Sequence, residues 1–377
     1  MGVPFFRHGI EEGDIERVVE TLRSPFLTTG ATTAAFEEQL ADFLGCGAAV
    51  GLMSCTHALF LALKAWGVGP GDEVLVPAMT FVASAGAVLH TGATPVFVDV
   101  DPRTGLIDLE LAEQSIGPST KALMVVHLYG QMVDMHAARA VVDRHGLKLL
   151  EDSAHCLEGG RDDIRPGQLG DAACFSFYAT KNITSGEGGA LVSNDRDLCD
   201  RVKRLRLHGM STDAVHRYTN RYKHWDVDEV GYKANLTDVQ SALLIGQLGR
   251  VESGLERREV IAREYERRLV ELGLGFPEVT PGSRSARHVF TTWAPEGRRD
   301  GFLATLQEAG IGVAVHFRAV PTLTVFANRH ETTRLSCPQA ERIGECTLTV
   351  PLYPSMTDAE VDEVVAALRR CVESDAD

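Results

Sequence analysis

Short apolar runs alternate with longer amphipathic segments through the first half of the chain. β-Branched runs such as 48–54 and 72–78 are each followed by a segment, 56–67 and 80–92, whose apolar spacing is typical of a helix. The expected strands lie at 48–54, 72–78, 94–101, 121–130 and 147–155. Strands that are apolar throughout and alternate with helices are typical of a mostly parallel sheet covered on both faces. The sequence therefore predicts an α/β fold.

The pattern changes near Leu236, where residues 236–273 read as a long helix with possible interruptions at Gly249 and Gly254. The segments expected after it are an extended stretch at 287–294, a helix at 302–310, a strand at 312–317 and a last helix opening with a Thr357–Glu360 capping box. We therefore expect a large domain over residues 1–250, with an N-terminal arm over 1–30, and a smaller α+β domain over 251–377.

Composition narrows the class of protein. The 377 residues carry a net charge of −15, with 44% hydrophobic and 24% charged residues, as in ordinary globular enzymes. An acidic chain argues against a nucleic acid or an anionic membrane as partner. The first residues lack the apolar core of a signal peptide, and no apolar run approaches a membrane span. We expect a cytoplasmic protein with no membrane or nucleic-acid partner.

Cysteine and histidine spacing gives no sign of a metal site. The eight cysteines are scattered and form no C-x-x-C pair, which favours reduced cytosolic thiols. The chain has no HExxH motif and no cysteine or histidine cluster with zinc spacing. We therefore predict no bound metal.

The usual nucleotide-binding loops are also missing, because neither G-x-G-x-x-G nor G-x-x-x-x-G-K-[ST] occurs. Ser54, Cys55 and Thr56 instead follow the first expected strand. Small and hydroxyl residues at a strand-to-helix junction can direct backbone N–H groups at an anion, although they are also ordinary helix caps.

A carboxylate and a lysine follow. Asp152 ends the last parallel strand before Lys181, where α/β sheets bind ligands, although it could equally cap the next helix. Lys181 lies in the polar, glycine-rich turn TKNITSGEGG, as either a solvated lysine or a covalent nucleophile. An anion-binding helix start, a strand-end acid and a lysine in a turn together make the set that pyridoxal 5′-phosphate (PLP) requires.

The same stretches carry a family resemblance over most of the chain. FLTTGATTAAFEEQLADFLGC, PAMTFVASAG, VVHLYGQMVDM, EDSAH, FSFYATKNITSGEGGALVSND and GYKANLTDVQSALL occur in this order. The chain resembles the PLP-dependent sugar aminotransferases of the DegT/DnrJ/EryC1/StrS family, which have the fold-type-I architecture of aspartate aminotransferase. The resemblance implies this α/β fold and a homodimer with shared active sites.

The resemblance also implies roles for individual residues. Lys181 would hold PLP as a Schiff base, Asp152 would bind the pyridine nitrogen, and His155 would contact the phenolic oxygen. Phe81 would stack on the ring, although it also suits a core position. The predicted phosphate ligands are the backbone of Cys55 and Thr56, the Ser176 hydroxyl, and Asn235 from the neighbouring subunit, with Lys233 as the alternative.

By resemblance, the amino donor would be L-glutamate, with the cofactor passing through its pyridoxamine 5′-phosphate (PMP) form. The acceptor would be a keto sugar, expected to be a nucleotide-linked keto-6-deoxyhexose. The candidates for the acceptor side, each equally open to a structural role, are Arg206, His208, Arg217, Arg221 and His316. A keto-cyclitol acceptor is the main alternative. A sugar dehydratase of the family has histidine in place of the Schiff-base lysine, so Lys181 argues against that activity. The intact set of Asp152, Lys181 and Ser176 argues against a non-catalytic regulator.

Overall fold

A seven-stranded sheet forms the centre of the computed structural model, which describes residues 2–211, 226–329, 332 and 335–373. The strand order is β1-β8-β7-β5-β4-β2-β3. The strands are β1 (Ala48–Leu52), β2 (Glu73–Pro77), β3 (Thr94–Val98), β4 (Thr120–Val126), β5 (Lys148–Asp152), β7 (Ala172–Ser176) and β8 (Gly189–Ser193). All neighbouring strands run parallel except β8, which is antiparallel to both β1 and β7. The predicted mostly parallel α/β sheet is confirmed.

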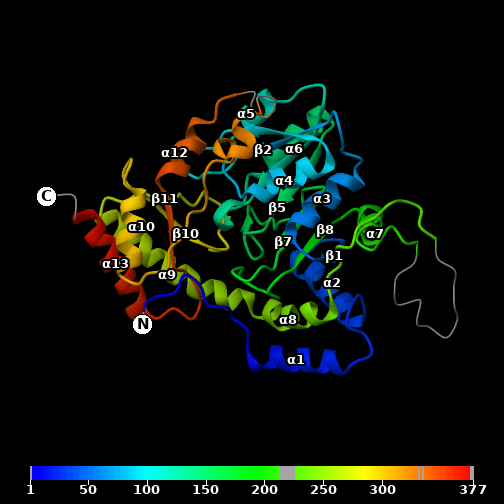
Figure 1. The fold of residues 1–377 in the computed structure, drawn as a ribbon, viewed down its shortest axis with the longest axis horizontal. Helices are drawn as coiled ribbons and strands as arrows, with labels where there is room; N and C mark the ends of the chain where they lie inside the picture. The colour runs from blue at the N-terminus through cyan, green and yellow to red at the C-terminus, as the bar shows by residue number, and fades with distance from the viewer. Residues whose placement is uncertain (1, 212–225, 330–331, 333–334, 374–377) are drawn as a thin grey trace.

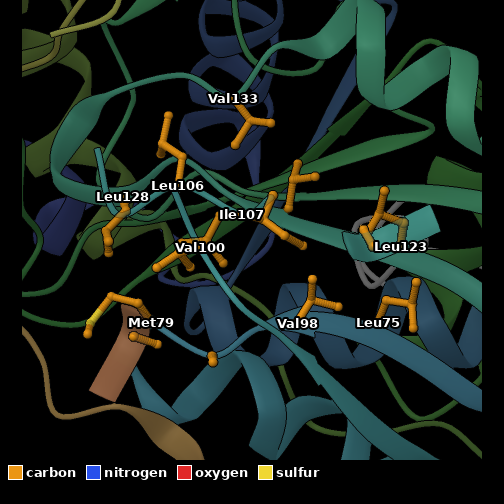
Figure 2. Packing of buried hydrophobic residues seen from close by; sticks show 14 of the residues in the cluster. Leu75, Met79, Val98, Val100, Leu106, Ile107, Leu123, Leu128 and Val133 are labelled. Atoms are coloured by element: carbon orange, nitrogen blue, oxygen red, sulfur yellow. The ribbon is translucent and has the colours of Figure 1, made fainter. Parts of the chain in front are cut away.

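Both faces of the sheet are covered by helices, as Figure 1 shows. Successive residues of a strand point to opposite faces, so Leu75 of β2 joins one apolar cluster while Val74 and Val76 join another. Figure 2 shows the first cluster, in which Leu75, Val98 and Leu123 from three adjacent strands lie together. This two-sided burial explains why the strands are apolar at nearly every position.

Helices α3 (Cys55–Ala65) and α4 (Val82–Thr91) begin just beyond the ends of β1 and β2. The other helices before residue 250 are α1 (Glu12–Arg23), α2 (Ala31–Leu44), α5 (Leu109–Gln114), α6 (Met135–His145), α7 (Arg196–Leu205) and α8 (Asp238–Gly249), with a 3-10 turn at Leu128–Gly130. Helix α1 lies along α8 at the edge of the molecule (Figure 1).

The long helix predicted over residues 236–273 is divided in two. Helix α8 ends at Gly249, Arg250 leaves the helical conformation (φ −121°, ψ 10°), and α9 (Val251–Glu271) begins at once. The expected interruption at Gly249 is therefore correct to within one residue. The interruption at Gly254 is wrong, because this residue lies inside α9.

A separate apolar cluster lies around α9 and the C-terminal elements, on the left in Figure 1. They include β10 (Phe290–Trp293), α10 (Arg299–Glu308), β11 (Thr347–Val350) and α13 (Asp358–Glu373). Helices α11 (Thr324–Ala327) and α12 (Pro338–Cys346) and a 3-10 turn at Val320–Thr322 contribute instead to the first cluster, beside the sheet. The short strands β6 (Gly160–Arg161) and β9 (Ser283–Arg284) pair with each other. The capping box of α13 is confirmed, since Thr357 and Glu360 exchange hydrogen bonds. The domain boundary at residue 250 stays a prediction.

The strand predicted over 312–317 is wrong. Only Ala314 pairs there, in a single bridge with Thr349, and the rest of the segment runs as irregular backbone. His316 and Phe317 at its end line the central cavity described below.

Three further observations concern the described residues. None of their helices is both long and apolar enough to cross a membrane. They contain no group of histidine, cysteine or acidic side chains arranged to hold a metal ion. All eight cysteines fall within them, as free thiols of which only Cys46 is not fully buried.

Candidate active site

A cavity of about 390 Å³ lies where the ends of β5 and β7 meet the first turns of α3 and α4. The residues that line it are Ser54, Cys55, Thr56, Leu59, Phe81, Ala83, Asp152, Ala154, His155, Ser176, Tyr178, Thr180, Lys181, Glu187, His288, His316 and Phe317. Every residue predicted to bind PLP is among them except Asn235. The fold therefore brings seven of the eight predicted residues to one place, from segments more than a hundred residues apart in the chain.

Lys181 presents its amine to this cavity from the turn after β7. The turn is closed by a hydrogen bond from the Lys181 N–H to the Tyr178 carbonyl, 2.9 Å long. Removal of the amine from water lowers the pKa of Lys181 to about 8, although Cys55 and Asp152 act in the opposite direction. A substantial fraction of the amine is therefore neutral, and nucleophilic, near neutral pH.

The Asp152 carboxylate is buried at the end of β5 and fixed by hydrogen bonds. Its Oδ2 accepts from the Ser84 hydroxyl at 2.7 Å, and its Oδ1 accepts from the Ala154 N–H at 3.1 Å. Ser84 is itself bonded to Thr80 at 2.8 Å. In the described part of the chain no helix starts between Asp152 and β6, so the helix-cap interpretation of this residue is wrong.

The start of α3 offers free backbone donors. The Ser54 hydroxyl caps the helix by accepting from the His57 N–H at 3.2 Å. Within the described residues, the N–H groups of Cys55 and Thr56 have no acceptor, as expected for the first turn of a helix. Gly189 of β8 packs so closely here that an added Cβ would overlap Ser54. The glycine therefore keeps this pocket open.

Two aromatic rings stand at the mouth of the cavity. Phe81 precedes α4 and is 54% exposed, which is unusual for phenylalanine and argues against a core position. Its ring centroid lies 5.5 Å from that of Phe317. Ser176, the last residue of β7, is half-buried beside the start of α3 and Lys181.

The His155 ring is neutral, and its contacts show which ring nitrogen carries the hydrogen. Its Nδ1 accepts from the Tyr129 N–H at 3.3 Å, so the ring hydrogen is on Nε2. Burial, and secondarily the nearby Lys181, His288 and His316, hold the pKa of His155 well below its usual value. A neutral ring of this tautomer can donate one hydrogen bond from Nε2.

The structure adds site residues that the sequence did not reveal. His288 lies 3.3 Å from Lys181, measured from Nε2 to Nζ, and Asn182 lies 3.0 Å from the other ring nitrogen of His288. His288 stands next to β10 in a segment predicted only as extended. The only feature of the sequence that could have identified His288 was the histidine in RHVF, and histidines occur throughout the sequence. His316 does line the cavity, and its Nδ1 is 2.9 Å from Thr349 Oγ1.

Of the remaining predicted residues, those that the structure describes do not line the cavity. Arg206 is buried and pairs with Glu37, so its role within this chain is structural. His208 is exposed in the turn after α7 and does not line the cavity. Asn235 is buried, with its amide donating to Thr28 at 2.8 Å and its carbonyl accepting from Lys233. Arg217 and Arg221 lie outside the described residues.

Comparison with known proteins shows the family to which this chain belongs. The model of the DegT/DnrJ/EryC1/StrS aminotransferase family matches residues 8–369. The spore coat polysaccharide biosynthesis protein SpsC of Bacillus subtilis is 41% identical, over 98% of this chain and 97% of that protein.

Solved structures of similar proteins agree. The PMP form of Spr1654 from Streptococcus pneumoniae, described as a sugar aminotransferase, superposes with a TM-score of 0.94 at 32% identity, covering 99% of this chain and all of that one. DesV of Streptomyces venezuelae gives a TM-score of 0.87 at 34% identity, covering 96% of this chain and 94% of that one. Spr1654 has also been solved in its PLP form.

The residues around the cavity fit PLP. A phosphate needs hydrogen-bond donors, and two free N–H groups lie at the start of α3. Gly189 has no side chain to fill the space beside them. A flat apolar ring needs a face to lie on, which the exposed Phe81 provides. An aldehyde needs a partly neutral amine, which Lys181 has.

Proposed function

We propose, since the chain belongs to the DegT/DnrJ/EryC1/StrS aminotransferase family, that it transfers an amino group from L-glutamate to a nucleotide-linked keto sugar. Membership makes it a PLP-dependent sugar aminotransferase. The donor and the nucleotide linkage are the proposed part. One observation carries the proposal: the Lys181 amine, the Asp152 carboxylate and the open start of α3 line a single cavity.

When bound, PLP supplies an electron sink that makes a C–H bond beside the transferred nitrogen acidic. Lys181 would hold the cofactor through its amine, and the same amine, once free, would be the group that gives and takes the proton. A pKa of about 8 suits this work, because near neutral pH the Nζ atom can both give up and take a proton.

Asp152 would face the ring nitrogen of the cofactor and favour its protonated form. Its two oxygens are already fixed by Ser84 and Ala154, so the carboxylate loses little freedom when the ring binds. A buried carboxylate facing a cationic nitrogen is more effective than an exposed ion pair, since water screens it less. His155 donates from Nε2 to the phenolic oxygen of the ring.

The remaining residues hold the cofactor in place. Phe81 would support one face of the ring, while Cys55, Thr56 and Ser176 would donate to the phosphate, the first two from the backbone. Asn235 reaches the phosphate bound by the partner subunit, which makes the active unit a homodimer. Support for this comes from its position outside the cavity of its own chain, with a polar side chain held by Thr28 and Lys233.

A second cavity supports a large, anionic acceptor. It measures about 270 Å³ and adjoins the first, because Phe81 and Phe317 line both. Arg318 stands exposed beside it and, among the described residues, has no acidic partner. Arg299 also lines this space but is paired with Asp300. An exposed guanidinium in a cavity that adjoins the one holding Lys181 suits a phosphate of the acceptor or a carboxylate of glutamate.

The test has two parts. Purified protein is treated with borohydride, digested and weighed, and the reduced PLP mass should appear on the Lys181 peptide and vanish in Lys181→Ala. The PLP-loaded protein is then given L-glutamate with a panel of nucleotide-linked keto-6-deoxyhexoses, free keto sugars and keto-cyclitols, and the products are weighed. Amination of the nucleotide-linked sugars alone supports the proposal, while amination of a keto-cyclitol alone refutes the acceptor class.

A further inference from the structure

His288 joins the Lys181 amine to a buried polar chain. Its Nε2 is 3.3 Å from Lys181 Nζ, and its Nδ1 is 3.0 Å from Asn182 Oδ1. The ring is 6% exposed, so water does not compete for either nitrogen. The direction of the Lys181–His288 hydrogen bond therefore depends on which nitrogen of the ring carries the hydrogen.

The neighbours of Asn182 settle the tautomer. The amide nitrogen donates to Glu158 Oε1 at 2.7 Å and to the Ala286 carbonyl at 3.1 Å, and both are acceptors. The amide oxygen must then face His288, so Nδ1 of the ring carries the hydrogen. In the neutral ring, Nε2 is left with a lone pair aimed at the Lys181 amine.

The ring is neutral because of its surroundings. Burial is the main cause, and the nearby positive charges of Lys181 and Arg258 add to it together with His316, so the pKa of His288 lies well below its usual value. The titratable and charged groups around the pair are Cys55, Asp152, His155, Glu158, Lys181, Arg258 and His316. A neutral ring accepts from Nζ whether the amine is charged or not.

We propose that His288 is a positioning residue for Lys181: its Nε2 accepts one N–H of the amine and so directs the amine lone pair into the cavity. Without this acceptor the Nζ atom rotates freely about its last bond, and only some orientations face the cofactor aldehyde. The inference rests on the proposed function, in which Lys181 is the residue that bonds PLP. If His288 has this role, the hydrogen-bonded side chains of Glu158, Asn182 and His288 are part of the active site.

Two neutral substitutions separate the contacts of the ring. In His288→Gln the longer amide reaches the place of Nε2 and can still accept from Lys181. In His288→Asn the shorter amide reaches the place of Nδ1, keeping the Asn182 contact but leaving the amine without an acceptor. Protein freed of cofactor is mixed with PLP, reduced with borohydride at intervals, and the modified Lys181 peptide is weighed.

We expect covalent attachment to slow by about 10- to 100-fold in His288→Asn, the loss typical of a misplaced reacting group. His288→Gln should stay within about threefold of the unmodified protein, as expected when a hydrogen bond is kept. PMP, which needs no bond to lysine, should bind both variants with the same Kd. His136→Gln, on the exposed face of α6, is the matched control for the substitution itself.

Three results would overturn the role of His288. Attachment at the normal rate in His288→Asn means that the acceptor is not needed. An equally slow His288→Gln means that accepting a hydrogen bond is not what the ring does. Loss of PMP binding in both variants assigns the ring a structural role instead. An adduct on a lysine other than Lys181 in the unmodified protein refutes the proposed function, independently of these comparisons.

Discussion

Replacing Asp152 by asparagine removes a charge while leaving its contacts in place. The remaining oxygen still accepts from the Ala154 N–H, and the new amide can donate to the Ser84 hydroxyl. Ser84 can accept this bond because its own hydrogen can turn to Thr80, 2.8 Å away. We therefore expect the free energy of unfolding to change by less than about 1 kcal/mol, the net worth of one hydrogen bond.

The catalytic loss should be far larger. A buried charge that loses its partner typically costs about 3–5 kcal/mol. With about 1.36 kcal/mol for each factor of ten, the half-reaction should slow by about 10²- to 10⁴-fold. Covalent attachment at Lys181 should persist, because neither its amine nor the start of α3 is altered. The expected variant is folded, carries PLP and is nearly inactive.

The assay is a single-turnover reaction of PLP-loaded protein with L-glutamate, followed by the absorbance of the cofactor in a stopped-flow instrument. Cofactor content is measured separately by borohydride reduction and mass. Asp108→Asn is the matched control, since Asp108 caps α5 through the N–H groups of Glu110 and Leu111 and asparagine caps equally well. If Asp152→Asn reacted within about threefold of the unmodified protein, a difference below 1 kcal/mol, Asp152 would not be the partner of the ring nitrogen.

Three further predictions concern the amine, the subunit contact and the start of α3. Because only the neutral amine attacks PLP, the rate of covalent attachment should rise with pH and reach half its maximum near pH 8. A midpoint near 10.5, the ordinary pKa of lysine, would contradict the effect of burial on Lys181. Lys181→Ala and Asn235→Ala should each be inactive, and mixing the two variants should restore activity, because a mixed dimer has one intact site. If subunit exchange were demonstrated but no activity returned, the whole site would lie within one chain. Gly189→Ala should raise the Kd for PMP at least about fivefold, since its Cβ overlaps Ser54 and overpacking typically costs about 1–3 kcal/mol. Gly86→Ala, with open space around it, should leave the Kd unchanged.

The sequence was sufficient for the parts of the fold that depend on local pattern. The parallel strands could be predicted because each is buried on both faces and is therefore apolar at nearly every position. The break between α8 and α9 was placed at a glycine, although Arg250 is the residue that leaves the helix. The segment 312–317 was mistaken for a strand because a short apolar run rich in valine can also be irregular backbone that lines a cavity.

In the candidate site, the sequence likewise revealed only the residues that lie within local motifs. Cys55, Asp152 and Lys181 each lie within a continuous motif, so sequence order alone identified them. Ser84 and His288 escaped because their roles depend on contacts with residues 68 and 107 positions away in the chain. Arg206 was misread because a buried ion pair and a ligand-binding arginine look alike in sequence.

The site draws its two sets of residues from different parts of the chain. Asp152 and Lys181 come from the central sheet, whereas His288 and His316 come from the segments beyond α9. Glu158 connects them, since its Oε1 accepts from Asn182 and also pairs with Arg258 of α9. Burial raises the pKa of Glu158, and the positive charge of Arg258 opposes that rise. Helix α9 thereby holds the amide of Asn182, and through it the tautomer of His288, in the orientation that leaves a lone pair facing the catalytic amine.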